Sequence, residues 1–239
     1  MTHPQRAVIL AGGRGSRLYP YTTVFPKPLM PIQEKPILEI VLRQLKQAGF
    51  EHVTLAVGYL AELIETYCGD GSKFGLKIDY SREDEPLGTA GPLKLIQNLD
   101  RDFLVMNGDI LCTLNYVDMW QQHLQQGGLA TIGTYPKPVP INLGVLKLND
   151  HHQIADYIEK PILNYFVSMG IYYFKPEILD WIPTGQAFDL PDLMKKLIEA
   201  EHAPYAYLFD GLWLDIGRQQ DYAEAQDLFA QNQALFLPV

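Results

Sequence analysis

The sequence has little cysteine, no long apolar run and no excess of basic residues. With only two cysteines, Cys68 and Cys112, in 239 residues, a disulfide framework is excluded, and neither thiol belongs to a C-x-x-C pair. No run approaches the ~20 apolar residues of a membrane-spanning helix. Residues 1–6 lead directly into an expected strand, without the apolar stretch of a signal peptide. We therefore expect a cytoplasmic protein without a membrane partner.

The charge balance is acidic, with a formal net charge of −9. A nucleic-acid-binding surface needs a basic face, so a nucleic-acid partner is not expected. An acidic protein that binds phosphates must gather its positive charge in a pocket. Arg14, Arg17 and Lys27 lie close together in the sequence and can do this.

A glycine-rich loop follows the first expected strand, which covers residues 7–10. Gly12, Gly13 and Gly15 allow the backbone N–H groups to approach a bulky anion. Downstream, Pro26-Lys27-Pro28 holds one lysine on a stiff segment. A dinucleotide fingerprint would need glycine where Leu18 stands, and no lysine follows these glycines as it does in a P-loop. The loop is therefore predicted to bind phosphate in another way.

Apolar periodicity predicts alternating strands and helices in the first half of the chain. We expect strands over residues 53–57, 76–80 and 103–106, and helices over 37–45, 60–68 and around 93–96. Gly49 and Gly69 end the first two helices. This alternation favours a doubly wound α/β sheet that is largely parallel.

The second half predicts a looser arrangement. A helix over 117–125 precedes four short strands over 130–134, 144–148, 154–158 and 167–174, which we expect as mixed or antiparallel additions to the same sheet. Asp189 is expected to cap a helix that has Pro191 just inside. A strand over 205–209 and a helix over 221–235 follow.

Two carboxylates close apolar segments. Asp109 follows Asn107-Gly108 at the end of the fourth expected strand, and Asp215 lies between apolar neighbours, where an unpaired charge is costly. A lone aspartate at a strand end is more often a turn former or a helix cap. Two carboxylates together offer the hard oxygen ligands that Mg²⁺ prefers.

The segment Ala11-Gly12-Gly13-x-Gly15-Ser16-Arg17-Leu18-x-Pro20, followed by Pro26-Lys27-Pro28-Leu29-x-Pro31, resembles the signature of the sugar-1-phosphate nucleotidylyltransferases. The resemblance implies a Rossmann-like, GT-A-like α/β/α fold of three layers with a mixed, mainly parallel sheet. It implies one domain over 1–239, with a nucleotide-binding half (1–112) and a sugar-phosphate-binding half (113–239). The chain lacks the hexapeptide repeat of the C-terminal β-helix that many members carry, so a monomer or homodimer is expected.

The same resemblance assigns roles to individual residues. Catalytic roles fall to Arg17, Lys27, Asp109 and Asp215, and the two aspartates are also the Mg²⁺ ligands. The nucleotide-binding residues are Leu10, Ala11, Gly12, Gly13, Arg14, Gly15, Glu85, Gly88 and Thr89. The sugar-phosphate-binding residues are Gly144, Glu159 and Lys160. Leu143 replaces the aromatic residue often found before the glycine, which leaves the sugar open.

The segment Glu85–Leu93 resembles the mannose-1-phosphate guanylyltransferase form, in which it embraces the nucleobase. A carboxylate can accept hydrogen bonds from guanine N1–H and N2–H₂ together, which favours GTP and a mannose- or heptose-type 1-phosphate. Taken alone, the segment also fits a helix N-terminus with favourably placed acidic residues. Thymidylyl or uridylyl transfer to a glucose-type 1-phosphate, cytidylyl transfer to phosphocholine, and a non-catalytic subunit that senses nucleotide sugars stay open.

Overall fold

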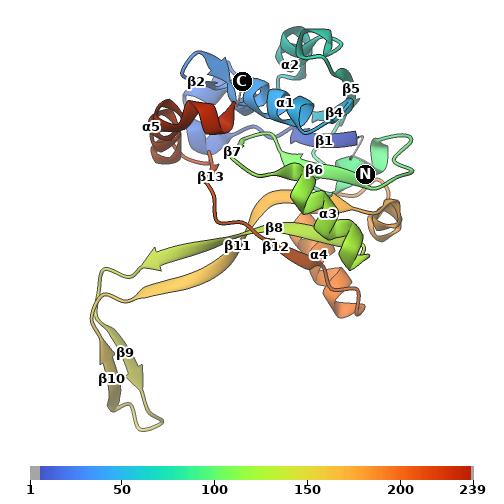
Figure 1. Ribbon diagram of the computed structural model, residues 1–239. Coiled ribbons are helices and arrows are strands. Elements are labelled where there is room, and N and C mark those ends of the chain that lie inside the picture. Colours follow the sequence, from blue (N-terminus) through green and yellow to red (C-terminus); the bar gives the residue numbers. More distant parts are fainter. Residues whose placement is uncertain (1–5, 238–239) are drawn as a thin grey trace.

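A seven-stranded sheet organises the protein, as the computed structural model shows for residues 6–237 (Figure 1). Its strands follow the order β12-β8-β11-β6-β1-β4-β5. They are β1 (Arg6–Ala11), β4 (His52–Val57), β5 (Lys77–Arg82), β6 (Phe103–Asn107), β8 (Ala130–Pro140), β11 (Ile162–Phe174) and β12 (Tyr205–Leu208). Strands β1, β4, β5 and β6 are mutually parallel, β12 is parallel to β8, and β11 is antiparallel to both of its neighbours. The predicted mixed, mainly parallel sheet is confirmed.

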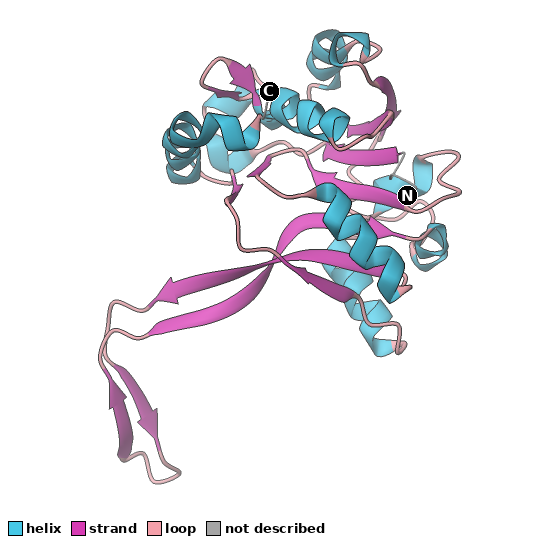
Figure 2. Ribbon diagram, viewed as in Figure 1, coloured by secondary structure: helices cyan, strands magenta, loops and turns pink. Residues whose placement is uncertain are grey.

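Helices cover both faces of this sheet and make three layers (Figure 2). Helices α1 (Ile37–Gln47), α2 (Ala61–Cys68) and α3 (Tyr116–Gln126) pack on the face to which Ala7 and Ile9 of β1 point. Val8 points to the opposite face, which α4 (Leu190–Glu199) covers. Alternation along one strand therefore supplies both cores. Helix α5 (Gln219–Phe236) packs beside α1 through Phe229.

Three two-stranded pairs complete the architecture of residues 6–237: β2 (Pro31–Ile32) with β3 (Lys35–Pro36), β7 (Ile110–Cys112) with β13 (Trp213–Asp215), and β9 (Val145–Leu148) with β10 (Ile154–Ile158). The β7–β13 pair is antiparallel, and Asp215 lies opposite Ile110. A segment from the end of the chain is thereby fastened next to Asp109.

The strands over 144–148 and 154–158 do not join the central sheet, so that expectation is wrong. Within the described part of the chain they pair only with each other, at the tip of a long hairpin that the outer parts of β8 and β11 form (Figure 1). The strand expected over 167–174 begins at Ile162. We call residues 135–167 the β-arm. It stands away from the layered part of the molecule, which we call the body.

Two local expectations are also corrected. The stretch around 93–96 is a 3-10 segment, Gly91–Leu95, rather than an α-helix, and Pro92 at its start lacks the N–H group of a regular turn. Asp189 precedes α4, but its side chain does not cap that helix. Its Oδ1 atom instead accepts hydrogen bonds from the backbone N and the hydroxyl of Thr89, at 2.9 and 3.0 Å.

Both cysteines, Cys68 and Cys112, are buried and have free thiols. Burial raises the pKa of Cys68 to about 12 and that of Cys112 to about 11, so neither forms a reactive thiolate near neutral pH. No helix within residues 6–237 is long and apolar enough to cross a membrane.

Candidate active site

The glycine loop begins where β1 ends, at the carboxyl edge of the sheet, where doubly wound folds bind their ligands. Gly15 adopts a left-handed conformation (φ 62°), and its carbonyl accepts a hydrogen bond from the Thr22 hydroxyl at 2.9 Å. A Cβ on Gly12 would lie 2.8 Å from a carboxylate oxygen of Glu83, so a larger residue here would displace the Glu83 side chain. Gly13 and Arg14 are exposed. The predicted phosphate loop is thus held by contacts at Gly12 and Gly15, while Gly13 and Arg14 between them are accessible to a ligand.

Lys27 is held on a 3-10 turn, Lys27–Leu29, that Pro26 and Pro28 stiffen. Its residue surface is only 8% exposed, and its ammonium group forms an ion pair with the carboxylate of Asp109. Asp109 follows β6, and the preceding Gly108 donates its N–H to the carbonyl of Leu10 at 2.9 Å. The end of β6 is therefore tied to the start of the glycine loop, which brings Lys27 and Asp109 to it.

Asp215 lies beside this pair because β13 pairs with β7. Desolvation by the surrounding protein raises the pKa of the Asp215 carboxyl above the ordinary aspartate value, and the negative charge of Asp109 acts in the same direction. The positive charges of Lys27 and Arg17 lower it. The guanidinium of Arg17 packs against Gly217, just past the end of β13. The structure thus brings Arg17, Lys27, Asp109 and Asp215 together, and we call these four residues the charged cluster.

The donor set of the cluster fits a divalent cation. Within residues 6–237, Oδ1 of Asp109 is buried and has no hydrogen-bond partner. Desolvation and, after it, the negative charge of Asp109 raise the pKa of Asp215, and a bound cation would offset both effects. In the described part of the chain no group of three or more His, Cys, Asp or Glu residues could hold a metal ion. Two carboxylates leave coordination positions for substrate phosphates, as in sites that hold Mg²⁺ through its substrate.

The expected nucleobase segment lies next to the glycine loop. Glu83 approaches Gly12 and Gly58, and its Oε2 atom accepts the N–H of Leu87 at 3.0 Å. Glu85 is exposed, so its carboxylate is accessible to a ligand.

Gly88 and Thr89 fasten the same segment to the start of α4. Gly88 has φ 76°, and a Cβ there would meet Asp189. The Thr89 hydroxyl bonds Asp189 and accepts the N–H of Leu190 at 2.8 Å. These two residues therefore position the segment through protein contacts.

The three sugar-phosphate residues lie elsewhere, on the β-arm. Glu159 and Lys160 lie between β10 and β11, where the arm bends, and their side chains are 60% and 66% exposed. The hydroxyl of Tyr157 donates to Glu159 at 3.1 Å, and its ring covers Gly144 so closely that no Cβ would fit. The structure does not bring these residues to the charged cluster.

Sequence reasoning missed several residues around the site. Glu83 belongs to no motif, and only the structure shows that its side chain lies against Gly12 and Gly58. The ring of Tyr135 packs on that of Trp213 at 5.2 Å between centroids, and the Lys137 ammonium lies 5.9 Å from the Trp213 centroid. Pro136-Lys137-Pro138 repeats the proline frame of Lys27, a signal that could have drawn attention to this second cation.

Comparison with known proteins adds a family match. The sequence model described as "Nucleotidyl transferase" matches residues 6–232. A UTP–glucose-1-phosphate uridylyltransferase from Synechocystis sp. is 39% identical, over 92% of this chain and 62% of that protein. The mannose-1-phosphate guanylyltransferase catalytic subunit beta of Danio rerio is 36% identical, over 95% of this chain and 65% of that protein. The chain thus spans less than two thirds of the length of these curated relatives.

Among solved structures, HddC from Yersinia pseudotuberculosis aligns with a TM-score of 0.73 and 26% sequence identity, over 94% of this chain and 99% of that one. The same protein has also been solved complexed with GMP-PN.

Proposed function

Because this chain belongs to the nucleotidyl transferase family, and its sheet and helices form the GT-A-like fold of nucleotide-sugar transferases, we propose that it transfers a nucleotidyl group from an NTP to a sugar 1-phosphate. The products are an NDP-sugar and pyrophosphate. The observation that carries the proposal is the convergence of Arg17, Lys27, Asp109 and Asp215 beside the glycine loop.

The reaction needs alignment and charge neutralisation more than proton transfer. An oxygen of the sugar phosphate attacks the α-phosphorus while the bond to the leaving pyrophosphate breaks in line. The nucleophile is already ionised at neutral pH, so no general base is required. Asp109 and Asp215 would hold Mg²⁺, which supplies positive charge to the reacting phosphates.

The other charged groups have separate tasks in this proposal. Arg17 neutralises the departing pyrophosphate, and Lys27 contributes positive charge at the reaction centre from a fixed position. The glycine loop directs its N–H groups to the triphosphate. Lys160 binds the phosphate of the acceptor and Glu159 its hydroxyl groups.

We propose GTP as the preferred nucleotide and a mannose- or heptose-type 1-phosphate as the acceptor. The likeness to the Danio rerio guanylyltransferase subunit and to the Yersinia structure complexed with GMP-PN supports this choice. So does the exposed carboxylate of Glu85, which can accept both donors on the guanine edge. Uridylyl transfer to glucose 1-phosphate is the second candidate, because the Synechocystis uridylyltransferase shares 39% identity with this chain.

The test is pyrophosphate release with Mg²⁺, in a matrix of GTP, UTP, dTTP, CTP and ATP against mannose, glucose, N-acetylglucosamine and heptose 1-phosphates and phosphocholine. GTP with a manno-configured acceptor is expected, and Glu85→Gln should then slow the reaction with GTP more than with UTP. UTP or dTTP with glucose 1-phosphate would establish the second candidate. CTP with phosphocholine would overturn the sugar acceptor. Folded protein that binds nucleotide sugars without turnover would instead be a regulatory subunit.

A further inference from the structure

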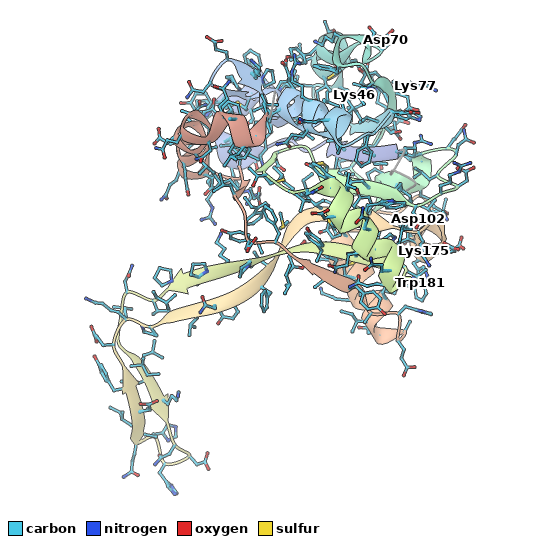
Figure 3. The ribbon with its side chains drawn as sticks, in the orientation of Figure 1. Lys46, Asp70, Lys77, Asp102, Lys175 and Trp181 are labelled. Atoms are coloured by element: carbon cyan, nitrogen blue, oxygen red, sulfur yellow. The ribbon has the colours of Figure 1, made fainter. Side chains whose placement is uncertain are left out.

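The β-arm carries an unusual share of the exposed apolar surface. Of the twenty-two large hydrophobic side chains that are exposed within residues 6–237, eleven lie on this arm. They are Val139, Leu143, Leu146, Leu148, Ile154, Tyr157, Ile158, Ile162, Leu163, Tyr165 and Phe166. Figure 3 shows the side chains of the arm projecting from both sides of the ribbon, clear of the body. An isolated two-stranded ribbon is at best marginally stable in water, so the arm needs a surface to pack on.

The amount of apolar surface matches a protein interface. Exposed fractions of 38–73% on these eleven side chains correspond to on the order of 1,000 Å² per arm, compared with ≈ 800 Å² per partner in a standard interface. Single exposed hydrophobic residues are ordinary, whereas eleven on one hairpin, distributed over its two sides, are a dense group that favours contact with another surface. The arm also contains three lysines and three carboxylates, so it is neutral and can approach an acidic body without added repulsion.

Backbone chemistry leaves one edge of the arm open to another chain. The N–H of Ile141 donates to the carbonyl of Pro161 at 3.0 Å and therefore points toward β11. Because successive residues of a strand direct their backbone nitrogens to opposite edges, the nitrogens of Pro136, Pro138 and Pro140 lie along the outer edge of β8. Proline has no N–H, and this edge is closed to strand addition. The outer edge of β11 from Ile162 to Ser168 has no neighbouring strand within residues 6–237. A strand that pairs with its own copy about a two-fold axis does so antiparallel, on the same surface of both chains.

The arm begins beside the charged cluster and leads away from it. Its root is fastened where Tyr135 packs on Trp213, two residues before Asp215. From the pair Thr134–Ser168 to the pair Pro140–Ile162 the ladder has seven residue pairs without interruption, a length of roughly 20 Å. Lys160 lies beyond that ladder. It could reach the cluster of its own chain only if this ladder bent or broke.

A second copy removes this difficulty. If the β11 edges of two chains pair antiparallel about a two-fold axis near the middle of the ladder, the tip of each chain's arm lies at the root of the other chain's arm. The segment with Tyr19, Tyr21, Val24 and Phe25, between the glycine loop and Lys27, offers an exposed apolar patch at that place, with exposed fractions of 52–70%. The arm of one copy and this patch of the other are complementary in character.

We propose that two copies of this chain exchange β-arms, so that Glu159 and Lys160 of each copy complete the acceptor site beside the charged cluster of the other. The inference rests on the proposed function in one respect, the role of Glu159 and Lys160 toward the sugar phosphate. The active unit is then a dimer with two composite sites, and a lone chain has no complete site.

The first experiment is sedimentation equilibrium of the full chain. The wild type is expected as a dimer, and the double variant Ile162→Glu/Phe166→Glu, which charges two exposed positions of the arm, as a folded monomer with little activity. Ile198→Glu, an equally exposed position on α4, is the matched control and stays dimeric and active. A monomeric wild type with full activity overturns the proposal.

The second experiment tests exchange through the site. Asp109→Asn and Lys160→Ala chains with different tags are co-expressed, and mixed dimers are isolated through both tags. One of their two sites combines a wild-type cluster with a wild-type arm, so pyrophosphate release at about half the wild-type rate is expected from the symmetry. With the sugar phosphate near the wild-type KM, mixed dimers no more active than the mean of the two parents would overturn the exchange while the proposed function stands. Full activity of Lys160→Ala alone would instead refute the role of Lys160, and sedimentation would then decide the exchange.

Discussion

Two lysines with the same local setting, each followed by proline, meet opposite conditions in this protein. The Lys27 side chain is 10% exposed and paired with Asp109 inside the body, whereas the Lys160 side chain is 66% exposed on the β-arm, and its nearest carboxylate, Glu159, is 4.0 Å away. The local sequence makes both segments stiff. Only Lys27 is also positioned by contacts from distant parts of the same chain. The difference shows that a locally stiff lysine becomes part of a site only where the fold also brings partner residues to it, as Asp109 is brought to Lys27.

The largest effect is expected when the positive charge of Lys27, the lysine that the fold positions, is removed. Lys27→Met keeps the length of the side chain and should leave the protein folded, while it lowers the rate of pyrophosphate release by ~10²–10³, because one electrostatic contact to the transition state is lost. Lys195→Met, on the exposed face of α4, serves as the control. Turnover near the wild-type level in Lys27→Met would remove this lysine from the mechanism.

The arm lysine should behave differently. Lys160→Ala is expected to raise the KM for the sugar phosphate by roughly 10–100-fold, the value of one charge-assisted hydrogen bond, and to change the KM for the nucleotide much less. Steady-state kinetics with each substrate varied in turn makes the measurement. Lys147→Ala, on the same arm but paired with Asp156 at 3.0 Å, should have kinetics like the wild type. Equal effects of the two substitutions would mean that the arm acts only as a scaffold.

A smaller effect is expected where hydrogen bonds of Thr89, rather than an ion pair, hold two segments of the body together. Thr89→Val leaves the N–H of Leu190 without its hydroxyl acceptor and removes one donor to Asp189. A loss of about 1 kcal/mol in unfolding free energy, or ~2–4 °C in Tm, is expected. Thr184→Val, at an exposed turn, is the control in the same thermal unfolding experiment. An unchanged Tm would show that the bonds between Thr89 and the start of α4 add nothing to stability.

The smallest expected effect is an increase in Tm, in contrast to the decrease expected for Thr89→Val. The pKa of Asp215 is raised in the folded protein, so its ionised form destabilises the fold above the ordinary pKa of aspartate, and this cost vanishes as pH falls below that value. Without added metal, Asp215→Asn should therefore raise the Tm slightly at pH 7 and leave it unchanged in acid.

With Mg²⁺ added at pH 7, the wild type should have a higher Tm than Asp215→Asn, because a ligand stabilises the protein that binds it. Thermal scans with and without Mg²⁺ make both comparisons. A lower Tm for Asp215→Asn in the absence of metal would contradict the raised pKa.

The body was largely predictable because its elements follow local patterns. The alternation of strands and helices, the glycine ends of α1 and α2, and the strand that leads to Asp109 all depend on short-range periodicity. The proximity of Arg17 and Lys27 to Asp109 followed from one rule, that ligands bind at the carboxyl edge of such sheets.

Other features were beyond local reasoning. The hydrogen bonds that Asp189 makes to Thr89, and the contact of Glu83 with Gly12, join residues distant in sequence, so no local pattern encodes them. The arm has ordinary strand propensity in β9 and β10, and propensity does not say what a strand pairs with. Asp215 was paired with Asp109 through its likeness to a family motif, and the structure does bring these two distant residues together, while their role as metal ligands stays a prediction.

The pairing of β13 with β7 also sets the timing of assembly during synthesis. Asp109 leaves the ribosome on the order of 5–20 s before Asp215, at 5–20 residues per second. Throughout that interval the glycine loop, Lys27 and Asp109 exist without the second carboxylate, and the nascent chain has only half of its proposed cation site. Under the proposed function, affinity for metal and triphosphate would therefore depend on the arrival of β13, and these ligands would favour chains in which β13 has already paired with β7.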